Sequence, residues 1–116
     1  MPQETIRVRN IRSLPFIWIQ RSLLDVIRPS WKGLLAYTAL AYYADGASGS
    51  CRDVALKVLA EKVSTSEDSM RRGLEELVEK KAIRMKARFR MKNGSRVNLP
   101  NEYVLIDLAQ EKQEAI

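Results

Sequence analysis

Residues 58–83, VLAEKVSTSEDSMRRGLEELVEKKAI, decide the fold of this chain. In the second half of the stretch, apolar residues recur at i, i+4, i+7 and i+8, which is the spacing of one face of an α-helix. These apolar residues are Met70, Leu74, Leu77 and Val78. The opposite face carries the charged residues Asp68, Arg72, Glu75 and Glu79. The pattern predicts a helix with one face in a core and the other presented to a partner or to solvent.

A hydroxyl-rich break precedes this helix. Before the break, a shorter helix is indicated by the apolar stripe Leu56, Leu59, Ala60 and Val63. Ser64-Thr65-Ser66 interrupts that stripe, and two N-caps fit the next helix: Ser66, or Ser64 in an S-x-x-E capping box with Glu67. Either cap places Glu67 and Asp68 at a helix N-terminus, where the helix dipole favours acidic groups. The stretch therefore predicts two helices joined by a tight turn, a helix-turn-helix.

The segment after this motif alternates without error between apolar and basic residues. The apolar set is Ile83, Met85, Ala87, Phe89 and Met91, and the basic set is Arg84, Lys86, Arg88, Arg90 and Lys92. Residues 83–98 hold six basic residues and no acidic one, which equals the net charge of +6 of the whole chain. The alternation predicts a strand with one apolar and one cationic face. Cations of this density favour a polyanionic partner over simple protection of a sheet edge.

The dipeptide at residues 93–94, Asn-Gly, predicts the turn of a β-hairpin. A two-residue loop would place Arg90 opposite Val97 and mix the two faces. A three-residue loop that includes Lys92 would place Arg90 opposite Arg96 and keep apolar side chains together. We therefore expect the three-residue loop.

The rest of the chain supplies a scaffold helix and irregular segments. Ser30 predicts an N-cap, and the helix after it is expected to stop at Gly46. We further expect a short strand at residues 16–19, one helical turn at 22–27, a loop at 45–51, a bulge or sheet edge at Pro100 and a last strand at 103–108. Residues 1–14 are expected to form a basic arm that contacts DNA or a frayed edge strand, and residues 109–116 a polar tail or linker.

Composition narrows the classes of function. A chain of 116 residues, 46% hydrophobic and 29% charged, fits one globular domain. It contains no histidine and one cysteine, Cys51, so we expect no metal site, no cofactor and no enzymatic activity. No apolar run approaches the roughly 18 residues of a membrane span, so we expect no membrane partner and a cytoplasmic location.

The order of scaffold helix, helix-turn-helix and hairpin makes residues 15–108 resemble the winged-helix domains. More narrowly, they resemble the helix-turn-helix modules of phage and plasmid replication initiators and related transcription regulators. The resemblance is carried by Leu59-Ala60-Glu61, Ser66, Ser69 and residues 70–77, 80–83 and 101–105. It implies an α+β fold with a three-helix core, a β-hairpin wing and a short N-terminal strand. Ser64 and Ala82 stand where glycine is common, so the corner at Ala82 must avoid positive φ. Glu67 and Asp68 stand where polar or basic residues are common.

Resemblance and charge pattern together predict a DNA-binding protein, either a replication initiator or a transcription regulator. The second motif helix would enter the major groove of duplex DNA with Thr65, Ser66, Ser69, Arg71 and Arg72. The wing would grip phosphates or a minor groove with Arg84, Lys86, Arg88, Arg90, Lys92 and Arg96. The alternatives are a module that binds a replication or transcription protein, favoured by the neutral charge of residues 51–82, and a binder of structured RNA. A homodimer on paired half-sites is a further expectation.

Overall fold

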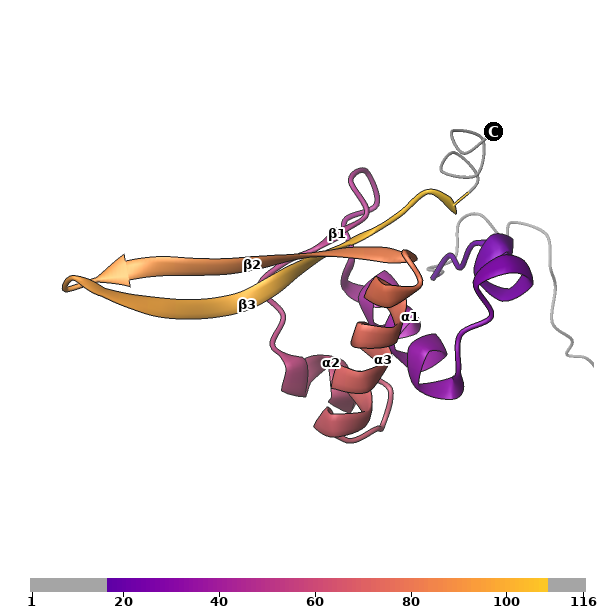
Figure 1. Ribbon diagram of the computed structural model, residues 1–116, viewed down its shortest axis with the longest axis horizontal. Coiled ribbons are helices and arrows are strands. Elements are labelled where there is room, and N and C mark those ends of the chain that lie inside the picture. Colours follow the sequence, from indigo (N-terminus) through magenta and orange to yellow (C-terminus); the bar gives the residue numbers. More distant parts are fainter. Residues whose placement is uncertain (1–16, 109–116) are drawn as a thin grey trace, which may run out of the picture.

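The computed structural model describes residues 17–108, which form four helices and a three-stranded antiparallel sheet (Figure 1). The helices are η2 (Leu23–Ile27), α1 (Trp31–Tyr43), α2 (Leu56–Lys62) and α3 (Glu67–Glu79), and η2 is a π-helix. The strands are β1 (Ser50–Cys51), β2 (Ile83–Lys92) and β3 (Ser95–Leu105), in the spatial order β1-β3-β2. The expected α+β class is confirmed. The arm expected at residues 1–14 and the tail expected at 109–116 lie outside the described residues.

Helices α1 and α3 form the centre of the core, and a glycine sets their close approach. A Cβ atom at Gly73 would lie 2.2 Å from the carbonyl oxygen of Lys32 and 3.0 Å from the Cβ of Ala36, so only glycine lets the two backbones come this near. Buried apolar residues from every other element join this centre. The buried core comprises Leu23, Ala36, Tyr37, Ala39, Leu40, Cys51, Leu59, Ala60, Met70, Leu74, Leu77, Ala82, Ile83, Tyr103 and Leu108.

The turn between α2 and α3 is closed by backbone and hydroxyl hydrogen bonds. Ser64 adopts a left-handed backbone with φ of 56°, and the Thr65 N–H donates to the carbonyl of Ala60 at 3.0 Å. The Ser66 hydroxyl accepts from the Ser69 N–H at 3.0 Å, so Ser66 rather than Ser64 is the N-cap of α3. Two helices joined by a short turn are therefore present, as the sequence predicts.

The corner between α3 and β2 uses Lys81 where a glycine would be easiest. Lys81 takes a φ of 63°, and its N–H donates to the carbonyl of Val78 at 3.0 Å. The next N–H, that of Ala82, donates to the carbonyl of Leu77 at 2.9 Å, which satisfies the end of the helix. Ala82 itself is buried and avoids positive φ, as expected.

The strand expected at residues 16–19 is wrong for its described part, because residues 17–20 have no regular structure. Hydrogen bonds of the Gln20 side chain, rather than strand pairing, join this segment to the residues after β3. The amide nitrogen of Gln20 donates to the carbonyl of Ile106 at 2.6 Å, and its amide oxygen accepts from the Leu108 N–H at 2.8 Å. Ser30 caps α1 as predicted, but the helix ends at Tyr43 rather than at Gly46.

The loop expected at residues 45–51 contains strand β1. Its two residues pair with Val104 and Tyr103 of β3, more than fifty residues away in sequence, so no local signal marks them as a strand. The return strand is also continuous, since β3 runs through Pro100 instead of starting at Tyr103. Pro100 lies in a bulge, because Pro100 and Asn101 together oppose the single residue Ala87.

The expected three-residue hairpin loop is wrong. Lys92 pairs with Ser95, and Asn93 and Gly94 form a two-residue loop with φ of 53° and 78°, the positive values of a type I′ turn. Arg90 consequently lies opposite Val97. The physical reason is that this end of the hairpin is not packed on the core: beyond Ile83 no residue of β2 is buried, so burial does not force apolar side chains onto one face.

Candidate nucleic-acid interface

Strands β2 and β3 extend away from the helices as a long two-stranded ribbon (Figure 1). We call residues 83–105 the basic hairpin. Ile83 and Tyr103 at its base are buried, but three apolar side chains of β2 are largely solvated, with Met85, Phe89 and Met91 exposed to 50%, 52% and 62%. A ribbon that is exposed on both faces has little stability of its own in water, so its base must be held firmly.

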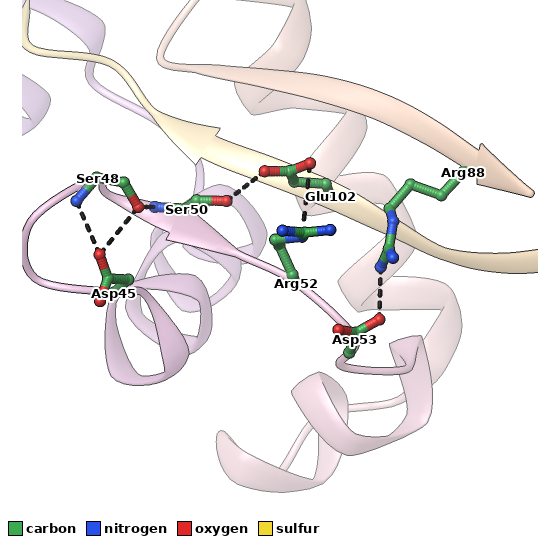
Figure 2. A network of polar contacts seen from close by, with 7 residues as sticks. All are labelled: Asp45, Ser48, Ser50, Arg52, Asp53, Arg88 and Glu102. Carbon is green, nitrogen blue, oxygen red and sulfur yellow. Dashed lines mark hydrogen bonds and ion pairs between the residues drawn. The ribbon is translucent and has the colours of Figure 1, made fainter.

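A polar network holds the base of the basic hairpin against β1 (Figure 2). The Ser50 hydroxyl donates to Oε2 of Glu102 at 2.5 Å, and Nε of Arg52 lies 3.9 Å from Oε1 of the same carboxylate. The hydrogen bond from Ser50, followed by nearby cations, lowers the pKa of Glu102. Glu102 is therefore ionised at neutral pH and joins the hairpin to the body.

Arg88 belongs to this anchor rather than to the exposed cations. Its guanidinium donates to Oδ1 of Asp53, which lies just beyond β1, and its side chain is only 19% exposed (Figure 2). The hydrogen bond from Arg88, together with its charge, lowers the pKa of Asp53. A phosphate would have to compete with this carboxylate for Arg88.

Of the other predicted wing cations, Arg90, Lys92 and Arg96 lie farther out along the ribbon than Arg88, and Arg84 and Lys86 lie nearer its base. Four of them have no carboxylate of residues 17–108 within ion-pair distance: Lys86, Arg90, Lys92 and Arg96. All four are exposed. The guanidinium carbon of Arg96 lies 4.4 Å from the ring centroid of Phe89, which leaves its positive charge available. Arg84 is exposed near the base of the hairpin.

Within β2 the apolar and basic side chains alternate between two faces, as expected, but pairing with β3 mixes the two kinds on each face of the hairpin. Because of the bulge and the two-residue loop, Phe89 lies opposite Asn98 and Met91 opposite Arg96, while Arg90 lies opposite Val97. Cross-strand partners share a face of a sheet. Each face of the outer ribbon therefore carries both cations and apolar groups.

The predicted recognition helix presents a different surface. Arg71 and Arg72 both form ion pairs with Asp68, at 3.6 and 2.9 Å. They are the only basic residues that the sequence predicts as DNA contacts on α3. The Ser66 hydroxyl is used as the helix cap, and Ser69 and Thr65 are partly buried. Exposed acidic residues flank this site on α3, namely Glu67, Asp68, Glu75 and Glu79. The presented face of α3 thus has more negative than positive charge.

Between α3 and the base of the basic hairpin lies a groove of 570 Å³ that sequence reasoning missed. Its wall is mostly apolar and is lined by Val54, Leu56, Leu59, Leu74, Val78, Met85, Leu99, Pro100 and Tyr103. Arg71, Glu75, Glu79 and Asn101 supply its polar groups. The apolar periodicity of α2 and α3 predicts Leu56, Leu59, Leu74 and Val78 as core residues, whereas in the structure they also line this open groove.

The described residues offer little to metal or thiol chemistry. No group of three or more potential metal ligands occurs among residues 17–108. Cys51 is buried, and burial raises the pKa of its thiol, which opposes formation of the nucleophilic thiolate.

No helix within residues 17–108 is long and apolar enough to cross a membrane. Comparison of the sequence with protein-family models and with curated proteins, and of the structure with solved structures, gives no significant match.

Proposed function

We propose that this protein is a DNA-binding protein of the winged-helix type in which the basic hairpin is the main binding element. One observation carries the proposal: the basic hairpin carries four exposed cations that form no ion pair within residues 17–108. They are Lys86, Arg90, Lys92 and Arg96. Three of them lie on the outer part of the ribbon, which projects clear of the body, and Lys86 lies nearer the base, opposite Glu102. Phosphate contacts supply most non-specific affinity for DNA, and exposed, unpaired cations make them at the least cost.

Helix α3 has a secondary role in this proposal. The ion pairs of Arg71 and Arg72 with Asp68 are exposed, and exposed pairs of this kind contribute only about 0.2–1 kcal/mol, so phosphates can replace the carboxylate. The acidic residues around them nevertheless oppose deep entry into a phosphate-lined major groove. Replication initiation and transcription regulation both use a DNA contact of this kind.

The proposal is tested by fluorescence anisotropy with a labelled random duplex of about 20 base pairs, a length comparable to a protein binding site. We expect the wild type to bind, and Arg90→Glu/Lys92→Glu to lose binding to every duplex alike. The control Arg21→Glu/Lys57→Glu makes the same charge change at exposed residues elsewhere and should bind nearly normally.

Competition with unlabelled duplexes distinguishes DNA from RNA. An A-form RNA duplex has a deep, narrow major groove and a wide, shallow minor groove, so it offers the ribbon a different fit. We expect DNA to compete better. Absence of any binding to duplex DNA in low salt would contradict the proposed function.

A second candidate function rests on the groove beside α3. Its apolar wall and the carboxylates of Glu75 and Glu79 are complementary to a peptide with apolar side chains next to lysine or arginine, which would make the chain a protein-interaction module. A labelled synthetic peptide that alternates leucine and lysine is a suitable probe. Its binding should be lost in Glu75→Lys/Glu79→Lys and retained in Arg90→Glu/Lys92→Glu.

A further inference from the structure

Phe89 and Met91 are the most unusual apolar residues of the basic hairpin. They lie on the same face of its outer part and are 52% and 62% exposed, although large apolar side chains of a β-strand are normally packed against a core. The residues opposite them, Asn98 and Arg96, are polar, and although the Arg96 guanidinium lies 4.4 Å from the centroid of the Phe89 ring, both apolar side chains stay more than half exposed. In the turn beyond them, Asn93 and Gly94 are also exposed, so no described part of the body approaches this end of the ribbon.

The charge around these side chains restricts what can cover them. A second copy of the same ribbon would bring Arg90, Lys92 and Arg96 against like charges, which is unfavourable. An apolar protein surface would bury the same cations without partners. A polyanion that also offers apolar contacts satisfies both requirements, and duplex DNA does so with its phosphates and its stacked bases.

The distribution of cations favours a groove with phosphates on both sides. Arg90 lies on one face of the ribbon, and Arg96 lies on the other face beside Phe89. An undistorted minor groove is only about 6 Å wide, less than a two-stranded ribbon with its side chains, so entry requires the groove to open. Proteins that open it commonly insert an apolar side chain between base pairs and bend the duplex.

We propose, building on the DNA-binding function above, that the basic hairpin enters the minor groove and that Phe89 and Met91 act as a wedge that unstacks a base step and bends the DNA. Arg90, Lys92 and Arg96 hold the two flanking backbones. The bent duplex then follows the ribbon over a longer path than a straight duplex could.

Fluorescence energy transfer between dyes at the two ends of a duplex of about 30 base pairs measures the bend. We expect the wild type to shorten the end-to-end distance and Phe89→Ala/Met91→Ala to abolish the shortening. The affinity of this variant for DNA should stay within about threefold of that of the wild type. The reason is that the free energy lost in unstacking the bases nearly equals the free energy gained from the wedge contacts. Phe89→Leu/Met91→Leu keeps an apolar wedge and should keep the bend.

A matched control removes exposed apolar side chains outside the basic hairpin. Leu24 and Val26 are 55% and 58% exposed, and Leu24→Ala/Val26→Ala should bend DNA normally. Thermal unfolding followed by circular dichroism verifies that each variant is folded. Increased fluorescence of 2-aminopurine placed in the duplex would report the unstacked step, and we expect it with the wild type and with Leu24→Ala/Val26→Ala but not with Phe89→Ala/Met91→Ala.

The outcomes separate the wedge from the proposed function. If the wild type binds DNA without bending it, or if Phe89→Ala/Met91→Ala bends it fully, the wedge is wrong and DNA binding stands. If the wild type binds no duplex, the proposed function fails as well. Binding to vesicles of anionic phospholipid that depends on Phe89, stronger than binding to DNA, would overturn the inference in favour of a membrane surface.

Discussion

Removal of exposed cations from the basic hairpin should change the salt dependence of DNA binding by a calculable amount. Each phosphate contact contributes about −0.9 to the slope of log K against log salt concentration. Four exposed cations form no ion pair within residues 17–108, namely Lys86, Arg90, Lys92 and Arg96, and four phosphate contacts predict a slope of about −3.6 for the wild type. Arg90→Ala/Lys92→Ala leaves two contacts and predicts a slope of about −1.8.

The same relation gives the loss of affinity. At about 0.15 M salt, each contact is worth roughly fivefold in K relative to 1 M salt, so loss of two contacts should weaken binding about 25- to 30-fold. Anisotropy titrations of one random duplex over a series of potassium chloride concentrations measure both quantities. Arg21→Ala/Lys57→Ala removes the same charge from exposed residues outside the hairpin and should leave the slope near that of the wild type.

Two results would refute this reasoning. A wild-type slope near −1 would mean that the basic hairpin makes few phosphate contacts. An unchanged slope in Arg90→Ala/Lys92→Ala, with a halved slope in Arg71→Ala/Arg72→Ala, would assign the phosphate contacts to α3 instead.

Three further substitutions test the anchor and the core. Asp53→Asn should release Arg88 for a phosphate, tighten DNA binding and steepen the salt slope by about 0.9. Glu76→Gln should lower the free energy of unfolding by about 1–2 kcal/mol at neutral pH in urea titrations, because Ser30 and other donors hydrogen-bond an 18% exposed carboxylate. Gly73→Ala should destabilise by about 1–3 kcal/mol or more in the same assay, because its Cβ would press on the α1 backbone.

The effect of Glu76→Gln should depend on pH in one direction. Burial raises the pKa of Glu76, but hydrogen bonds from Ser30 and Lys80 outweigh it and lower the pKa to about 2 from the usual 4.5. Because the folded pKa lies below the unfolded one, this stability is complete above pH 4.5 and is lost as the pH falls toward 2. The difference between wild type and variant should shrink over that window, and a constant difference would contradict the assignment.

The remaining two substitutions have their own controls. Asp53→Glu keeps a carboxylate near Arg88 and should give the same salt slope as the wild type. If Asp53→Glu and Asp53→Asn gave equal slopes, the ion pair would not restrain Arg88. Gly46→Ala places a methyl group where no atom lies within 4 Å and should be nearly neutral. Equal stability of Gly73→Ala and the wild type would show that α1 and α3 can separate at no cost.

Local signals in the sequence predicted the second motif helix closely. The apolar spacing from Met70 to Leu77 and the hydroxyl of Ser66 act within one or two turns, so they specify α3 in almost any surroundings. The pairing of Arg72 with Asp68 at i, i+4 is equally local. The sequence therefore held the signal that the arginines of α3 are paired, although our prediction listed them as DNA contacts.

The sequence predicted that the hairpin exists and that it is basic, but it did not predict the register of its two strands. The Asn93-Gly94 turn and the alternation of β2 are local. Which side chains oppose each other depends on the bulge at Pro100 and on whether a core covers the ribbon. No part of residues 17–108 covers the outer ribbon, so the apolar pairing that we expected contributes no burial energy there.

The sequence by itself determined the two motif helices and the six cations of the basic hairpin, because these depend on neighbours a few residues apart, but it left the N-cap of α3 open between Ser64 and Ser66. Only the tertiary structure decided that β1 joins the sheet, that Asp53 restrains Arg88 across 35 residues, and that a groove stays open beside α3. These features arise where distant surfaces meet, and the geometry of that meeting is set by the whole core rather than by any one segment.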